Sequence, residues 1–268
     1  MVSVGIFGAP RSGTSWLGQI FNSSPAVAYR FQPLFSFALK GRLSGSNSPE
    51  QIQEFNNDLL ITKDDFILQK KNINGNEIAD FPKKSISHLV WKEVRYHYII
   101  KNLLNNSSTK IVGIVRHPCA VINSWLQAPK EFSSSWNPKE EWRNAEKKNA
   151  GKLEEYNGYE KWKELAFLYK QLASEFPNKF YIIKYEDLNT KSEFEVRKLF
   201  DFVNLEWNKQ TEDFIRMSKE TNSDDPYGVY RANQENYKWK NELDLEIAGA
   251  ILTDKDYLDL NKYYKWSI

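Results

Sequence analysis

Short apolar runs alternate along the chain with segments in which apolar residues recur every three to four positions. The runs predict buried strands and the periodic segments predict helices. Expected strands cover residues 4–7, 26–31, 87–92, 110–115 and 180–183. Expected helices cover residues 14–22, 48–60, 64–71, 96–104, 118–127, 159–176, 193–203 and 209–217, with a last helical segment from about Glu242. The run from Lys110 to Val115 is the clearest strand, of the kind buried on both faces of a parallel sheet.

The alternation of strands and helices predicts βαβ units with right-handed crossovers and a mainly parallel sheet. We therefore expect an α/β fold with three layers, P-loop-like, in which helices flank the central sheet. The chain has 268 residues, no internal repeat and short connections, so residues 1–268 are expected to form a single domain.

One stretch departs from this regular alternation. From Ala128 to Gly151, Pro, Ser, Asn, Lys and Glu dominate, and Trp136 and Trp142 are interleaved. We predict a mobile lid or acceptor-binding loop over residues 128–155. The alternative is a surface connection whose tryptophans pack locally.

Composition and charge restrict the kind of partner. The net charge is +2, from 37 basic and 35 acidic residues, so no nucleic-acid partner is indicated and any anion site must be local. No apolar stretch is long enough to span a membrane, and the first strand begins too early for a signal peptide to precede it. The single cysteine, Cys119, fits a reducing compartment. We expect a soluble, cytoplasmic protein, although removal of a targeting segment would leave the same pattern.

The first strand leads into a loop typical of phosphate sites. Residues 8–15 read Gly-Ala-Pro-Arg-Ser-Gly-Thr-Ser, close to the P-loop pattern G-x-x-x-x-G-K-[ST]. Thr14 stands where that pattern has lysine, which argues against hydrolysis of ATP or GTP, whereas Arg11 can hold a phosphate bidentately. No apolar strand ends in the aspartate that usually holds Mg²⁺. The loop predicts a phosphate-bearing nucleotide bound without metal; the alternative is a Gly/Ser turn that only joins strand to helix.

These residues resemble the sulfotransferase family that uses 3′-phosphoadenosine 5′-phosphosulfate (PAPS). Residues 11–22, with Phe31-Gln32-Pro33-Leu34 downstream, look like the 5′-phosphosulfate loop of the Golgi carbohydrate 6-O-sulfotransferases, which read R-S-G-[ST]-S-[FW] and then F-E-P-L. Residues 110–125 look like the family's 3′-phosphate-binding strand and helix. Weaker likenesses are residues 185–188, similar to the family's Y-E-D, and the C-terminal group Tyr230-Arg231, Lys238-Trp239-Lys240 and Leu243.

The resemblance implies a role for each matching residue. The 5′-phosphosulfate end is expected to bind the N–H groups of Ser12, Gly13, Thr14 and Ser15 and the side chains of Arg11, Thr14 and Ser15. Trp16 is also expected to contact the nucleotide. The 3′-phosphate falls to Arg116 and Ser124, for which the alternatives are a helix-start ion pair and an ordinary helix residue. Tyr185 is expected against the adenine, or else in the core, and Arg231 is expected to add a cation at the 3′-phosphate, or else to be a solvated loop arginine.

The general base is the point at which the chain departs from the family. Gln32 stands where the carbohydrate branch has glutamate, and a neutral amide cannot accept the acceptor's proton. Glu93 is the first candidate, with an ion pair to Lys92 or Arg95 as the alternative, and His97 is the second, with a helix-surface position as the alternative. Lys92 is expected to contact the transferring sulfuryl group. Together with Arg11, expected to stabilise the leaving phosphate, these residues complete the predicted catalytic set.

The leading hypothesis is a PAPS-dependent sulfotransferase that acts on a hydroxyl-bearing acceptor, a saccharide or glycoconjugate, and leaves 3′-phosphoadenosine 5′-phosphate (PAP). No metal is required, and the sequence does not indicate an oligomeric state. Two alternatives stay open. One is a P-loop kinase or NTPase, and the other is a catalytically silent nucleotide-binding protein of the same fold.

Overall fold

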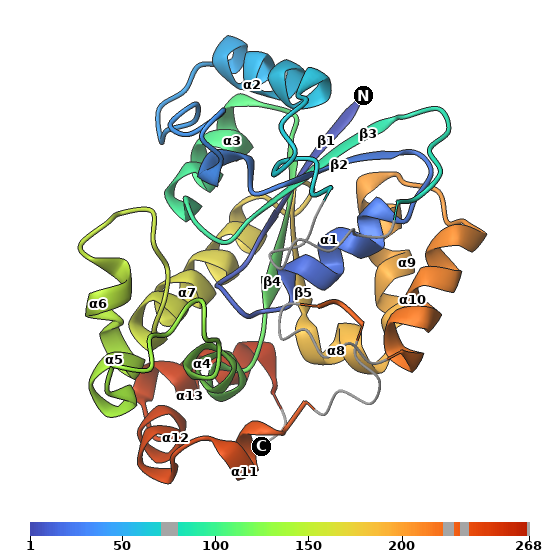
Figure 1. Ribbon diagram of the computed structural model, residues 1–268. Coiled ribbons are helices and arrows are strands. Elements are labelled where there is room, and N and C mark those ends of the chain that lie inside the picture. The colour runs from blue at the N-terminus through green and yellow to red at the C-terminus, as the bar shows by residue number, and fades with distance from the viewer. Residues whose placement is uncertain (71–79, 222–227, 231–235, 267–268) are drawn as a thin grey trace.

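The protein is built around one sheet of five parallel strands. The computed structural model describes residues 1–70, 80–221, 228–230 and 236–266. The strands are β1 (Val2–Phe7), β2 (Val27–Phe31), β3 (His88–Glu93), β4 (Lys110–Val115) and β5 (Phe180–Lys184). They lie in the order β2-β3-β1-β4-β5, and each neighbouring pair is parallel (Figure 1). The predicted α/β fold with a parallel central sheet is confirmed.

Two layers of helices cover the sheet. One face packs against α1 (Thr14–Asn22), α8 (Tyr185–Thr190), α9 (Ser192–Val203) and α10 (Lys209–Glu220) (Figure 1). The other packs against α2 (Pro49–Ile61), α3 (Ile100–Asn106), α4 (Pro118–Leu126), α7 (Tyr159–Glu175), α12 (Leu245–Leu252) and α13 (Lys255–Tyr264). Shorter elements are the 3₁₀ turns η1 (Pro33–Phe35) and η2 (His97–Ile99) and the helices α5 (Pro138–Asn144), α6 (Glu146–Asn149) and α11 (Trp239–Glu242).

Strand alternation divides the core between the two faces. Val90 of β3 packs toward α1 and α9, whereas the next residue, Trp91, packs toward α2 and α3. Residues buried on both faces explain why β4 reads as an uninterrupted apolar run. Because all five strands are parallel, their carboxyl ends meet at one edge of the sheet, where such folds bind ligands.

One local expectation was wrong, and one helix was not predicted. Residues 64–70 form turns rather than a helix, because the Asp64 carboxylate accepts a hydrogen bond from the Ile67 backbone N–H at 2.9 Å and Gln69 has a φ of 51°. The chain after β5 turns at once into α8, a helix that the sequence did not indicate. No side chain caps α8, so the usual start signal is missing.

The segment 128–155 contains α5 and α6 and packs through its aromatic residues. Trp142 is buried, and Trp136 lies edge-on to Phe132, with 5.4 Å between the ring centroids. The local packing of the tryptophans agrees with the alternative interpretation of this segment; its role as a lid or acceptor loop stays a prediction. Within the described ranges, none of the helices combines the length and the apolar character that a bilayer crossing requires.

Candidate functional site

The loop between β1 and α1 contains two residues with a left-handed backbone. Arg11 and Gly13 have φ angles of 70° and 94°, in the left-handed region. A Cβ on Gly13 would lie 2.4 Å from Tyr185 Cδ2, so the close contact between the loop and this ring requires glycine. Gly13 is also the N-cap of α1 and supplies no side-chain cap. The first N–H groups of α1 therefore lack a side-chain acceptor and form an anion site of the usual kind.

Lys92 brings a cation to this loop from the neighbouring strand. Parallel pairing of β1 with β3 sets Lys92 beside Ile6, one residue before the end of β1. Its ammonium donates to Thr14 Oγ1 at 3.4 Å and to Ser15 Oγ at 3.3 Å, and it lies 4.4 Å from the centre of the Phe31 ring. Burial lowers the pKa of this amine from 10.5 to about 7. An anion next to it would favour the charged form again.

Two arginines join the loop to β4 and α4. Arg11 Nε donates to Ser124 Oγ at 3.1 Å, and Arg116 Nη1 donates to the carbonyl oxygen of Arg11 at 3.2 Å. The Arg116 guanidinium also lies over the Tyr185 ring, 4.4 Å from its centre. The structure thus brings the two predicted phosphate segments together, although Arg11 and Ser124 are 113 residues apart.

Two buried polar atoms of the candidate site have no partner among the described residues. They are Ser12 Oγ and Arg116 Nε. Both side chains are mostly buried, at 1% and 8% exposure. An unpaired buried donor costs about 1–3 kcal/mol, so a bound anion at these atoms would recover stability. The donor set therefore fits a ligand with more than one anionic group.

Trp16 and Tyr185 lie side by side at the edge of the loop. Their ring centroids are 6.2 Å apart in an edge-to-face arrangement, and Trp16 Nε1 donates to Ser218 Oγ on α10 at 3.0 Å. Tyr185 is 3% exposed and so also belongs to the core, as its alternative interpretation held. Arg231, the last predicted nucleotide contact, lies outside the described residues.

The two proposed bases, Glu93 and His97, lie at the end of β3 and in η2. Glu93 follows Lys92, and its side chain therefore points to the other face of β3, where Oε1 accepts from the Leu34 N–H at 2.7 Å. Its Oε2 is buried without a partner among the described residues, and burial raises the pKa of the carboxyl to about 8. Gln32 accepts from Arg95 Nη1 at 3.2 Å.

His97 is enclosed by the core rather than exposed on a helix. Its Nδ1 lies 3.1 Å from the Tyr169 hydroxyl, and its ring packs against Tyr156 and Phe7. The imidazole is 1% exposed, and burial lowers its pKa to about 3. The helix-surface alternative for His97 was wrong, since η2 turns the side chain inward. Its ring contacts are with Phe7, Tyr156 and Tyr169, none of which belongs to the loop.

Two acidic residues of the site were missed by the sequence analysis. Glu131 Oε1 lies 3.3 Å from Arg11 Nη1. Glu186 Oε1 accepts from the His117 N–H at 2.8 Å and Oε2 from Trp266 Nε1 at 3.1 Å, which fixes the turn after Arg116. Glu186 lay within a segment noted for its family likeness, but Glu131 carried no motif that could have identified it.

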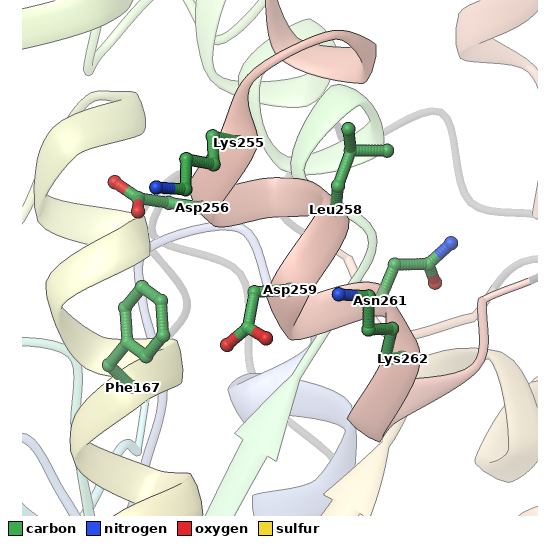
Figure 2. Close-up of a pocket in the computed structure, with 7 residues that line it drawn as sticks. All are labelled: Phe167, Lys255, Asp256, Leu258, Asp259, Asn261 and Lys262. Carbon is green, nitrogen blue, oxygen red and sulfur yellow. The ribbon is translucent and has the colours of Figure 1, made fainter.

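A surface hollow elsewhere on the molecule is separate from this site. It has a volume of about 850 Å³ and lies between α7 and α13 (Figure 2). Its lining comes from Phe167, Lys255, Asp256, Leu258, Asp259, Asn261 and Lys262. None of these residues belongs to the loop or to a strand end, so the hollow has no part in the site.

Comparison with known proteins gives one family and one fold. The model of a family described as "Sulfotransferase family" matches residues 4–209. None of the curated proteins matches the chain by sequence. Mouse sulfotransferase SULT7A1 complexed with PAP is 14% identical with a TM-score of 0.53, covering 98% of this chain and 89% of that one.

Two further solved structures share the fold. A sulfotransferase from Alicyclobacillus acidocaldarius is 13% identical with a TM-score of 0.55, covering 100% of this chain and 97% of that one. Retinol dehydratase in complex with androsterone and PAP is 16% identical with a TM-score of 0.55, covering 99% and 82%. At these identities the likeness establishes the fold alone.

Proposed function

The chain belongs to the sulfotransferase family, and from this premise we propose that it transfers a sulfuryl group from PAPS to a hydroxyl group of an acceptor, leaving PAP. One observation carries the proposal: Arg11, Lys92 and Arg116 converge on a single loop that opens the uncapped start of α1. The structures of mouse SULT7A1 and retinol dehydratase were determined with PAP, which supports the same nucleotide here.

The nucleotide's two anionic ends are assigned to two groups of residues. The 5′ end is assigned to the loop, with Gly13 allowing the close approach of the backbone; its side-chain contacts are Arg11, Ser12, Thr14 and Ser15. Arg116 and Ser124 are assigned to the 3′-phosphate, and the unpartnered Arg116 Nε supports this. For the adenine we propose Trp16 and Tyr185, and for a second cation at the 3′-phosphate, Arg231.

Sulfuryl transfer requires that the protein position the reactants and stabilise the developing negative charge. PAPS supplies an activated sulfuryl group, whose transfer spreads negative charge over sulfuryl and leaving-phosphate oxygens, as in phosphoryl transfer. Lys92 neutralises this charge from β3, at the loop hydroxyls it already contacts. Arg11 presents a guanidinium that can bind two oxygens at once. The Phe31 ring lies beside Lys92, which is 2% exposed, and the exclusion of water strengthens the interactions of its charge.

We assign the acceptor's proton to Glu93, with His97 as the second candidate. Glu93 has a buried oxygen without a partner in the described part of the chain, and its pKa of about 8 is close to the working range of a general base. Replacing Glu93 with glutamine should lower kcat while the affinity for PAP stays within about twofold. Equal turnover by wild type and Glu93→Gln would remove Glu93 from the reaction, and loss of turnover in His97→Phe alone would transfer the role to His97.

For the acceptor we propose a saccharide or glycoconjugate hydroxyl. The support is the likeness of residues 11–22 and 31–34 to the carbohydrate branch, and residues 128–155 are proposed to cover the acceptor. Incubation with PAPS and matched panels of glycans, lipid alcohols and phenols, followed by mass spectrometry, tests this. Sulfation of phenols or lipids but of no glycan would refute the saccharide assignment and keep the transfer.

The donor is tested separately by binding. Calorimetry should show PAP binding without Mg²⁺, and Arg11→Ala should reduce both PAP affinity and turnover. ATP or GTP binding that requires Mg²⁺, without PAP binding, would support a P-loop kinase or NTPase instead. Tight PAP binding without turnover on any acceptor would support a silent nucleotide-binding protein.

A further inference from the structure

The carboxylate of Glu131 forms an ion pair with Arg11, the arginine that is expected to bind the donor. Its Oε1 lies 3.3 Å from Arg11 Nη1, while Arg11 Nε is held by Ser124. The two side chains of the ion pair are 14% and 25% exposed, so the pair is partly shielded from water. Arg11 and Glu131 are 120 residues apart, and therefore the tertiary fold, not local sequence, creates this contact.

The position of Glu131 is fixed by its neighbours. The Glu131 and Phe132 N–H groups both donate to the carbonyl oxygen of Ala128, at 2.9 and 2.8 Å. The Phe132 ring is buried edge-on between Trp125 and Trp136, with centroid distances of 5.1 and 5.4 Å. This aromatic anchor connects the backbone at Glu131 to α4, the helix that carries Ser124. The carboxylate is thus built into the site rather than left on a loose surface chain.

The charge of Glu131 opposes an anionic ligand. A phosphosulfate at Arg11 would meet a fixed carboxylate within a few ångströms of the same guanidinium, in a partly shielded setting where repulsion is stronger than in water. The negative charge of Glu131 also acts at Lys92, where it partly offsets the lowering of the amine's pKa by burial. In the protein without donor, Arg11 and Lys92 therefore both interact with the negative charge of Glu131.

We propose that Glu131 is the counter-ion that positions Arg11 in the donor-free protein and gives up the guanidinium to the donor's anionic group. When PAP leaves, Glu131 pairs with Arg11 again and lowers the affinity for the product. The inference rests on the proposed function, because it takes Arg11 as a donor contact. Residues 128–155 would then act on donor binding and product release as well as on the acceptor.

The test is the affinity for PAP of Glu131→Gln, measured by calorimetry on the full chain. Glutamine keeps the size and a hydrogen-bonding oxygen but removes the charge, so PAP should bind about two- to fivefold more tightly, the range expected for a partly exposed ion pair. The matched control is Glu140→Gln in α5, which removes the same charge from the same segment. Glu140 is 64% exposed and pairs with Lys147, so its change should leave PAP affinity unchanged.

A second background separates exchange at Arg11 from general repulsion. In Arg11→Ala, the added change Glu131→Gln should alter PAP affinity by less than about twofold, because no shared guanidinium is left. Tighter binding of the same size in both backgrounds would overturn the exchange. The exchange would also be overturned if Glu131→Gln, with Arg11 in place, bound PAP no more tightly than wild type.

Kinetics supply a measurement that a purely structural role would not move. Glu131→Gln should lower the inhibition constant of PAP by the same factor as its dissociation constant. A fall in kcat of more than about 100-fold with PAP affinity unchanged would overturn the exchange and make Glu131 the proton acceptor. Failure of the wild-type protein to bind PAP would instead refute the proposed function, so the two failures are distinguishable.

Discussion

Replacing Lys92 with methionine separates the stability of the fold from binding of the donor. Lys92 is 2% exposed, and its native pKa of about 7 lies well below its usual 10.5 because burial disfavours the charged amine. At about 1.4 kcal/mol for each pH unit, this difference destabilises the native state by about 4 kcal/mol at pH 7. Methionine fills a similar volume and carries no charge, so it removes this cost.

The cost has a defined pH dependence. A lowered native pKa means that the unfolded chain binds more protons, so the destabilisation is complete below pH 7 and disappears as the pH rises toward 10.5. The gain in unfolding free energy from Lys92→Met should therefore be about 4 kcal/mol at pH 7, about 2 kcal/mol at pH 9 and near zero above pH 10.5. In a chain of this size the gain at pH 7 raises Tm by about 5–10 °C.

Thermal unfolding and PAP calorimetry on the same samples measure both effects. Lys92→Met should be more stable than wild type yet bind PAP about 10- to 100-fold more weakly, since it lacks a charge-assisted contact in a shielded site. The matched control is Lys184→Met at the end of β5, where the lysine is 22% exposed and pairs with Asp187 at 3.0 Å; we expect no gain in stability there. A lower Tm for Lys92→Met at pH 7, or PAP affinity equal to wild type, would refute the reasoning.

Three further predictions concern the loop, the 3′-phosphate and the core. Gly13→Ala should lower stability by about 1–3 kcal/mol and abolish PAP binding by calorimetry, because the new Cβ meets Tyr185 at a φ of 94°. Wild type should bind PAP more tightly than adenosine 5′-phosphate, and Arg116→Ala should reduce this preference by about tenfold or more. A preference equal to that of wild type would remove Arg116 from the 3′-phosphate. The native pKa of His97 is about 3, so only the unfolded chain protonates this ring between pH 6.5 and 5. Over that interval the free energy of unfolding, measured with urea, should fall by about 1.6 kcal/mol more in wild type than in His97→Phe. An equal fall in the two proteins would contradict the burial of His97 as a neutral ring.

The sequence predicted those parts of the molecule that depend on local pattern. Strand, glycine-containing loop and amphipathic helix follow one another from β1 to α1, so spacing alone located the site's centre. Where a polar side chain competes with the backbone, as Asp64 does, pattern alone gave a helix that the structure replaces with turns. The error at His97 has a similar origin, because the direction of a side chain leaving a 3₁₀ turn is set by what it packs against.

The sequence indicated one long-range arrangement, that of the two phosphate segments at one end of the sheet. Arg116 ends a buried strand and Arg11 follows another, so their meeting at one sheet edge is a consequence of parallel topology. Glu131 has no such constraint. It reaches Arg11 because Phe132 packs on Trp125 and Trp136, and the composition of residues 128–151 does not specify which of their side chains turn inward.

The loop lacks the P-loop lysine, but β3 lies beside β1 and brings Lys92 to the same loop. In the P-loop of nucleotide triphosphatases, lysine precedes the Ser or Thr whose hydroxyl binds Mg²⁺. Here Ser15 holds that second position, and its Oγ accepts from the Lys92 ammonium at 3.3 Å. A cationic side chain thus lies where the P-loop hydroxyl would meet a divalent ion, and it comes from the adjacent strand rather than from the loop. With Lys92 in this place, a loop that has Thr14 in the lysine position still has a cation beside it to bind an anion. This placement favours sulfuryl transfer, with the cation supplied by the protein, over phosphoryl transfer that depends on Mg²⁺.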